Sequence, residues 1–357
     1  MKQQFVSGLK EGSIVSAPFL VRQKEIRTSP RTGKSWLELD LMDSTGTIPA
    51  KMWDNFAAIA GTFEADDVVQ VRGRVKIYNG QKEVTLEQIV PAAERDYEIA
   101  DFLPHTRHDV EKLYAELQAT IGALKNPWLK RLLESLTNDP AVAAKLKRAP
   151  AAMTMHHAYM GGLLEHVVSL LGLARAVAAQ YPELDWELLV AGVVLHDIGK
   201  IEELRYERGI DYSTEGRLLG HIAIGARLVA ERIRAIPDFP APLAVAVQHL
   251  ILSHHGTHEF GSPALPQMRE AVALNFLDDF DSKMASMRVT LESGADEAAA
   301  GAAEWTERNP SLRRSLLRTE QYFDGKPAAA KNASGKAAAA PGATATLNFG
   351  KGPAGKR

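Results

Sequence analysis

The sequence contains no cysteine among its 357 residues. This absence excludes disulfide bonds, thiolate nucleophiles and zinc sites built from cysteine, and it fits a reducing compartment. The first twelve residues lack the apolar run that a secretory signal needs. No segment approaches the roughly 20 consecutive apolar residues of a membrane-spanning helix. We therefore expect a cytoplasmic protein with no membrane partner.

The sequence also lacks a charge excess of either sign, since its formal net charge is -2. The whole-chain charge therefore does not indicate a nucleic-acid partner, and only local patterns could. The cations are unevenly distributed, because residues 326–357 carry six Lys or Arg and no Asp or Glu. This stretch is rich in Ala, Gly and Pro, and we expect residues 324–357 to be a disordered basic tail.

Residues 12–92 have the strand and turn patterns of a small barrel. Five runs of strand length are alternating or β-branched, at 14–21, 35–41, 46–53, 68–78 and 82–89. The pair Asn79 and Gly80 between the last two runs predicts a tight hairpin, because both turn positions can need positive φ. Five short strands in about 80 residues favour an OB-type barrel, a fold that commonly binds oligonucleotides.

From about Asp101 onward, apolar residues recur at three- and four-residue spacing, which is the pattern of amphipathic helices. We therefore predict a multidomain α+β protein in which an OB-type β-barrel is followed by an all-α domain. The expected divisions are a nucleic-acid-binding barrel at 8–95, a helical connector at 96–155, the all-α domain at 156–323 and the basic tail.

The strongest local feature is the adjacent pair His196 and Asp197 at the end of an apolar helical run. A neighbouring imidazole nitrogen and carboxylate oxygen can ligate one divalent cation. Further candidate ligands lie on separate predicted helices: His166, His221, His254 and Asp278. Inward-facing His and carboxylate side chains from several helices form the metal sites of helical bundles. A lone His on an apolar helix is more often a hydrogen-bonded core residue, so the prediction depends on the whole set.

The order H…HD…H…H…D resembles the HD superfamily of metal-dependent phosphohydrolases. The resemblance implies that all six residues are ligands, with His221 and His254 marking the two-metal versions of the family. It also implies that Asp278 is the closing ligand, although Asp281 three residues later is the alternative. We expect His157 and His255 to lie in the pocket or behind the ligands.

Mixed nitrogen and oxygen ligands suit manganese, iron, cobalt, nickel or zinc better than calcium. Two such ions about 3.5–4 Å apart can clamp the attacking and leaving oxygens of a displacement at phosphorus. We predict Asp197 and Lys200 as catalytic residues, because Lys200 lies one helical turn from the pair and could neutralise a phosphate oxygen. A solvated lysine at a helix end is an equally common alternative, and Arg217 is a second cationic candidate.

The predicted strands of the first domain carry cations and aromatic rings together. Cations that track phosphates, with rings on which bases stack, form a general surface for binding single strands. The candidate binding residues are Lys24, Arg31, Lys34, Trp36, Lys51, Trp53, Arg72, Arg74, Lys76 and Tyr78. Trp36 and Trp53 could equally belong to the barrel core.

Over roughly residues 8–323, an OB-type barrel followed by an HD domain resembles the YhaM-type 3′–5′ exoribonucleases. The resemblance depends on long stretches that include residues 161–166, 215–221, 252–256 and 260–263. It implies manganese-dependent removal of nucleotides from the 3′ ends of single-stranded RNA, with single-stranded DNA as a further candidate. Whether one ion binds or two, and whether copies of the chain form a homo-oligomer, stays open.

Two other functions compete with the exonuclease. The first is a hydrolase of small nucleotides in which the barrel is regulatory. Cyclic-dinucleotide enzymes of the HD superfamily carry Gly-Tyr-Pro after the paired histidines, whereas Gly256, Thr257 and His258 follow here, which disfavours that subgroup. The second is a non-catalytic RNA-binding protein with a structural metal, and the complete ligand set argues against it.

Overall fold

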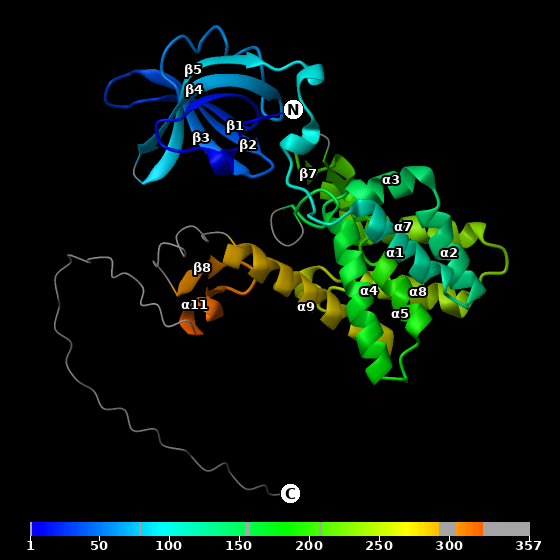
Figure 1. Ribbon diagram of the computed structural model, residues 1–357. Coiled ribbons are helices and arrows are strands. Elements are labelled where there is room, and N and C mark those ends of the chain that lie inside the picture. Colours follow the sequence, from blue (N-terminus) through cyan, green and yellow to red (C-terminus); the bar gives the residue numbers. More distant parts are fainter. Residues whose placement is uncertain (1, 79, 154–157, 207–208, 293–303, 324–357) are drawn as a thin grey trace, which may run out of the picture.

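The computed structural model describes residues 2–78, 80–153, 158–206, 209–292 and 304–323. A β-barrel at the N-terminal end is followed by a helical region (Figure 1), so the predicted fold class is confirmed. The predicted tail at 324–357 and the candidate pocket residue His157 lie outside the described residues.

The barrel is closed by five strands in the order β1-β2-β3-β5-β4. They are β1 (Ile14–Thr28), β2 (Ser35–Asp43), β3 (Gly46–Met52), β4 (Val68–Tyr78) and β5 (Gln81–Pro91). Neighbouring strands are antiparallel except β3 and β5, which pair in parallel. All five predicted strands are therefore present in this part of the chain.

Alternation along the strands separates the barrel core from its outer surface. In β4, the side chains of Val69, Val71 and Val75 are buried, while those of Arg72 and Arg74 are exposed. The strand register shifts near Gly73, where an added Cβ would lie 2.4 Å from the carbonyl oxygen of residue 85. A glycine therefore permits the close approach of β4 and β5. The exposed side chains of these strands are mostly polar or charged, together with Ile77, Tyr78 and Val90.

The connector packs the barrel against the helical region. It contains the 3-10 helices η2 (Glu94–Asp96) and η3 (Ile99–Asp101), while η1 (Val6–Gly8) precedes the barrel. Phe102 and Leu103 are fully buried in one cluster with Leu20, Met42 and Val68 of the barrel. The two folded parts are thus joined by a shared apolar cluster.

The helical region contains α1 (Val110–Gly122), α2 (Pro127–Thr137), α3 (Pro140–Arg148), α4 (Gly162–Gln180), α5 (Trp186–Leu195), α6 (Lys200–Glu203), α7 (Thr214–Ala235), α8 (Ala241–Ser253), η4 (His258–Phe260) and α9 (Arg269–Glu292). The side chains of Asp109, Asn126, Asp139 and Asp185 cap α1, α2, α3 and α5 by accepting backbone N–H groups.

The helix α5 is the centre of this region. It is apolar on all sides, and every residue from Leu188 to Leu195 is buried. Helices of this composition belong in the core rather than at the surface. The next residues in the chain, His196 and Asp197, are therefore delivered to the interior.

Short strands accompany the predicted helices. The pair β6 (Leu204–Arg205) and β7 (Asp211–Tyr212) lies between α6 and α7, and β8 (Trp305–Asn309) pairs with β9 (Arg314–Leu317) ahead of α11 (Thr319–Phe323). Buried Asn309 fastens the second pair to α9 by donating to Ser286 O at 3.2 Å and Thr290 Oγ1 at 2.7 Å.

Within the described ranges, α4 is the one helix that is long and apolar enough to cross a membrane. From the sequence we expected no segment to approach that length. The helix packs against α1, α3, α5 and α9. It also places Glu165 and His166 in the interior. The packing of α4 is that of a core helix.

Candidate active site

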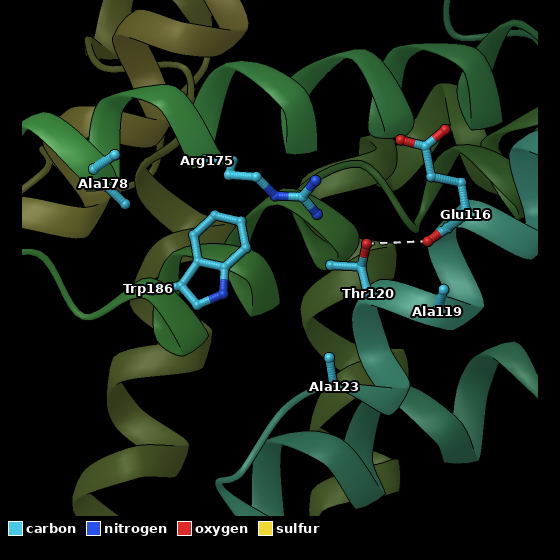
Figure 2. A pocket seen from close by; sticks show the side chains of 8 residues that line it. Glu116, Ala119, Thr120, Ala123, Arg175, Ala178 and Trp186 are labelled. Carbon is cyan, nitrogen blue, oxygen red and sulfur yellow. Dashed lines mark hydrogen bonds between the residues drawn. The ribbon is translucent and has the colours of Figure 1, made fainter.

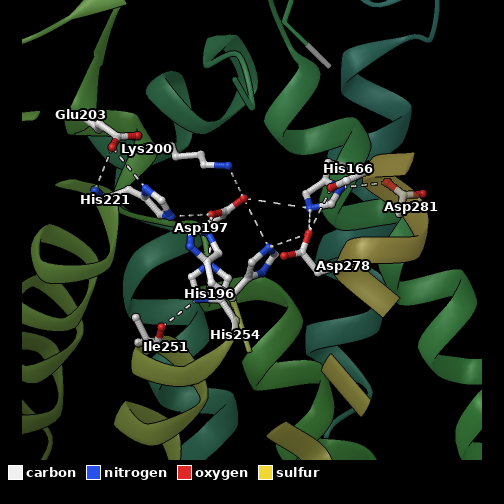
Figure 3. Close-up of polar contacts among 12 residues, drawn as sticks. His166, His196, Asp197, Lys200, Glu203, His221, Ile251, His254, Asp278 and Asp281 are labelled. Atoms are coloured by element: carbon white, nitrogen blue, oxygen red, sulfur yellow. Dashed lines mark hydrogen bonds and ion pairs between the residues drawn. The ribbon is translucent and has the colours of Figure 1, made fainter. Parts of the chain in front are cut away.

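The six predicted ligands come from five places in the helical region and meet at one point (Figure 3). His166 lies on α4, His221 on α7 and Asp278 on α9. The C-cap positions of α5 and α8 are His196 and His254, and both side chains are 0% exposed. Asp197 follows at the centre of the cluster.

The two oxygens of Asp197 face two different pairs of histidines. Its Oδ2 atom lies 3.3 Å from His196 Nε2 and 4.0 Å from His166 Nε2. Its Oδ1 atom lies 3.4 Å from His221 Nε2 and 3.6 Å from His254 Nε2. The carboxylate of Asp197 therefore stands between two groups of candidate ligands.

The structure places Asp278 and Asp281, which the sequence left as alternatives, at opposite edges of the His166 ring. Asp278 Oδ1 lies 3.2 Å from His166 Nε2 and 4.0 Å from His196 Nε2, on the side of the cluster. Asp281 Oδ2 instead lies 2.8 Å from His166 Nδ1, and its other oxygen accepts from Ser169 Oγ at 2.5 Å. Asp278 faces the candidate ligands, and Asp281 lies behind His166.

The hydrogen bonds made by the Nδ1 atoms determine which ring nitrogen is free. His196 Nδ1 lies 2.9 Å from Val193 O, and His254 Nδ1 lies 2.8 Å from Ile251 O. Because a carbonyl oxygen can only accept, Nδ1 carries the hydrogen in both rings and the neutral Nε2 carries a lone pair. These lone pairs point into the cluster, which is the orientation that a histidine needs to bind a metal ion there.

Four buried atoms of the cluster have no hydrogen-bond partner within the described parts of the chain: His196 Nε2, His221 Nε2, His254 Nε2 and Asp197 Oδ1. Buried polar atoms are nearly always paired, so such a group requires an explanation. Nitrogen lone pairs and a carboxylate oxygen repel one another unless a cation lies between them. The donor set therefore fits a divalent metal.

The pKa shifts of the histidines follow their surroundings. Burial lowers the pKa of His254 and of His255, which keeps both rings neutral. Burial works in the same direction on His166, but hydrogen bonds to Asp278 and Asp281 outweigh it and raise its pKa to about 9. The space between His166 and the two aspartates thus favours positive charge.

Lys200 lies inside the site and is not a solvated lysine at a helix end. Its Nζ atom donates to Asp197 Oδ2 at 2.6 Å, and its side chain is 12% exposed. Burial alone would raise the pKa of Asp197, but the ammonium group of Lys200 outweighs it and holds that pKa well below its usual range. Asp197 is therefore an anion with a cation beside it.

The remaining predicted residues lie at different distances from the cluster. Arg217, the second cationic candidate, is paired with Asp211 at 2.9 Å, and its side chain is 64% exposed. His255 is closer than expected, because its ring can bring a nitrogen within 4.8 Å of those of His221 and His254. Phe260 O lies 2.7 Å from His255 Nδ1 and orients the ring.

Glu203 was not among the predicted site residues, yet its carboxylate lies 3.1 Å from His221 Nδ1. Nothing in the sequence marks this residue, because 18 positions separate it from His221 and no spacing rule connects a helix end with a later helix. Figure 3 shows it on the far side of the His221 ring from Asp197.

A separate hollow of about 590 Å³ lies against α1 and α4 (Figure 2). Its lining includes Trp186 and Arg175, whose guanidinium lies 5.9 Å from the indole centroid, together with Glu116 and several alanines. None of the predicted ligands lines this hollow, so we do not place the reaction there.

The candidate nucleic-acid residues on the barrel divide into an exposed set and a paired set. The exposed members are Arg31, Lys34, Trp53, Arg72, Arg74, Lys76 and Tyr78. Lys24 donates to Glu64 at 2.9 Å, and Lys51 lies 2.5 Å from Glu83, so both cations already have carboxylate partners. The exposed cations are the ones accessible to phosphates, and among them Arg72 lies 3.9 Å from the exposed carboxylate of Glu87.

Trp36 and Trp53 lie side by side on the outer face of the barrel. Their ring centroids are 5.2 Å apart, and Trp53 is 48% exposed. The neighbouring residue Leu37 points into the core instead. Of the two alternatives that the sequence left, Trp53 therefore lies at the surface, and Trp36 is a half-buried ring beside it.

Two known domain families match the two folded parts. Residues 20–92 match the OB-fold nucleic acid binding domain, and residues 163–283 match the HD domain. The fold and the site therefore define a hydrolase of the HD superfamily that carries an OB-fold domain.

The chain is also similar to two named enzymes over most of its length. The 3′–5′ exoribonuclease YhaM of Bacillus velezensis is 38% identical over 284 residues, which cover 79% of this chain and 88% of that enzyme. The enzyme of the same name from Bacillus subtilis is 37% identical over 277 residues, with 77% and 87% covered. The chain belongs to the YhaM family of 3′–5′ exoribonucleases.

Proposed function

We propose that this protein is a metal-dependent 3′–5′ exoribonuclease that hydrolyses phosphodiester bonds of single-stranded RNA, with single-stranded DNA as a second substrate. The observation that carries the proposal is the placement of Asp197, whose two oxygens face separate sets of buried imidazole nitrogens. A carboxylate between two such sets is suited to join two cations.

The ligand sets follow from the side on which each residue lies. One ion would be held by His166, His196, Asp197 and Asp278, and the second by Asp197, His221, His254 and His255. Two divalent cations held there would supply Lewis acidity at the phosphoryl group and a water nucleophile near neutral pH. We propose manganese, with iron, cobalt, nickel and zinc as alternatives that suit the same donors.

The protein's own residues would hold and orient the substrate phosphate. Lys200 already lies 2.6 Å from Asp197, so its ammonium group is within reach of a phosphate that binds at the cluster. Its positive charge would balance a non-bridging oxygen. The surrounding helices leave little room for bulk water, because Asp197, His196 and His254 are buried.

The barrel would hold the strand that is being shortened. Exposed Arg72, Arg74 and Lys76 on β4 can track phosphates, and the paired rings of Trp36 and Trp53 offer a stacking surface for bases. Binding of this kind tolerates many sequences, which suits an enzyme that removes successive nucleotides. A cytoplasmic location and association of copies of the chain belong to the same proposal, and cell fractionation and sedimentation test them.

The decisive experiment incubates the protein with single-stranded RNA labelled at its 5′ end and with manganese. We expect a ladder of products that shorten from the 3′ end. Asp197→Asn should abolish this cleavage while the affinity for RNA stays the same, because the barrel is untouched. Degradation that starts from the 5′ end would contradict the proposal.

A small-nucleotide hydrolase with a regulatory barrel is the alternative. Turnover of mononucleotides or cyclic dinucleotides without any shortening of RNA would favour that function. Testing both substrates with the same preparation of protein separates the two.

A further inference from the structure

One buried carboxylate at the site lies outside the proposed ligand sets. Glu203, the last residue of α6, directs a single oxygen, Oε1, at two N–H groups of His221. The backbone nitrogen lies 2.9 Å from this oxygen, and the ring atom Nδ1 lies 3.1 Å from it. Burying a carboxylate costs free energy unless hydrogen bonds compensate, and here both compensating bonds come from one proposed metal ligand.

A break in α7 makes this double contact possible. Gly220 has φ +71° and ψ 157°, which is not helical, so the peptide that leads into His221 is turned out of the helix direction. Its N–H group then needs an acceptor outside the helix. Glu203 provides that acceptor and binds the ring of the same residue.

The backbone of Glu203 is packed against the first turn of α7, which fixes the point from which its side chain extends. Ser213, the N-cap of α7, donates its N–H to Glu203 O at 2.8 Å. A Cβ added at Gly216 would lie 2.1 Å from this same carbonyl oxygen, so the two segments are in direct contact. The backbone of Glu203 thus has a fixed position beside α7, and its two hydrogen bonds to His221 hold the carboxylate there.

We propose that Glu203 is a positioning residue for the second metal ion. By accepting from Nδ1 it holds the hydrogen on that atom and directs the lone pair of His221 Nε2 at Asp197 Oδ1, 3.4 Å away. Carboxylates that hold a ligating histidine in this way typically contribute 10–100-fold to metal affinity or activity. The inference rests on the proposed two-ion function of the site.

The test compares manganese binding by the full chain and by four variants, using calorimetric titration and the electron paramagnetic resonance of free Mn²⁺. Wild type should bind two ions. Glu203→Ala should lower the affinity for the second ion by roughly 10–100-fold and leave the first unchanged. The affinity of Glu203→Gln for the second ion should lie between those of wild type and Glu203→Ala, because an amide oxygen still accepts a hydrogen bond but carries no charge. His221→Ala gives the reference for loss of the second ion.

Glu202→Gln is the matched control, because the neighbouring residue points away from the cluster and pairs with Lys145 at 2.7 Å. It should bind both ions as wild type does. The unfolding temperature without metal is measured for every variant, and Glu203→Gln carries the test if Glu203→Ala does not fold.

Two results would overturn the inference, and they are distinguishable. Wild-type affinity for the second ion in the folded Glu203 variants, with loss of that ion in His221→Ala, would overturn the role of Glu203 alone. Binding of a single ion by the wild-type protein would overturn the two-ion function and the inference together.

Discussion

Asp278 and Asp281 lie one turn apart on α9 and contact opposite edges of one imidazole ring. Asp278 Oδ1 lies 3.2 Å from His166 Nε2, and Asp281 Oδ2 lies 2.8 Å from His166 Nδ1. The first is placed to share a cation with His166, and the second to orient the ring. The sequence could not separate them, because the rotation of α9 about its axis depends on how the whole helix packs.

Substitution of these two residues should therefore give different results. Asp278→Ala removes a proposed ligand and should abolish binding of the first manganese ion. Asp281→Ala should only weaken that binding, by roughly 10–100-fold. Manganese titration of each variant measures both effects. Equal loss in the two variants would contradict this assignment of roles.

Lys2 is a buried cation that lies away from the active site. Its ammonium group lies 3.2 Å from Asp43 Oδ2. Burial lowers the pKa of Lys2 from 10.5 to about 8, although Asp43 opposes the shift. Between these pH values the unfolded chain binds more protons than the folded one, so this residue makes stability rise with pH from 8 to 10.5.

Removal of the titrating group should remove this contribution. In Lys2→Met, we expect the rise in the free energy of unfolding between pH 8 and 10.5 to be smaller than in wild type, by at most about 3 kcal/mol. Urea unfolding across this range measures the difference. An identical pH dependence in the two proteins would mean that Lys2 does not titrate there.

At the scale of elements, periodicity predicted the five strands well, because burial on one face imposes alternation. It did not predict how far β1 extends, since β1 pairs with β4 along its first half and with β2 along its second. A strand that changes partner at a register shift needs both partners in place, and these lie far away in the sequence. The break in α7 was also not predicted, because the presence of one glycine in a helical pattern does not show whether its φ is positive.

Gly220 gives a prediction for that break. Its φ of +71° disfavours any residue with a Cβ, although nothing lies within 4 Å of the added atom. Gly220→Ala should therefore cost about 1–3 kcal/mol through backbone strain alone, because φ +71° with ψ 157° is a conformation open almost only to glycine, and it should weaken binding of the second metal ion.

The matched control is Gly172→Ala, because Gly172 lies within α4 at an ordinary φ and also has open space around it. Alanine there should stabilise the protein by up to about 1 kcal/mol. Thermal and urea unfolding of both variants give the comparison. A neutral Gly220→Ala would contradict the backbone strain expected at this position.

At the scale of the whole molecule, the sequence predicted that a barrel precedes a helical domain with a cluster of candidate metal ligands. It did not predict which cations of the barrel are paired with carboxylates. Lys24 and Lys51 belonged to the predicted binding set, yet their partners Glu64 and Glu83 lie 40 and 32 positions away. Only the closed barrel brings these charges together. The cations that stay exposed on β4 are therefore the better candidates for contact with RNA.

This surface gives a prediction about salt. Each cation that neutralises a phosphate of a single strand contributes about 0.7 to the slope of log affinity against log salt. The combined replacement of Arg72, Arg74 and Lys76 by alanine should therefore reduce that slope by about 2. Manganese binding and hydrolysis of bis-p-nitrophenyl phosphate should not change, because the metal cluster lies in the other folded part.

Fluorescence anisotropy with labelled single-stranded RNA at several salt concentrations measures the slope. Arg95→Ala serves as the matched control, since Arg95 is an exposed arginine in η2, outside the barrel strands, and should leave the slope as it is in wild type. If the triple variant keeps the wild-type slope, the strand does not follow β4. If it also loses hydrolysis of the small ester, the barrel affects the chemistry itself rather than the capture of RNA.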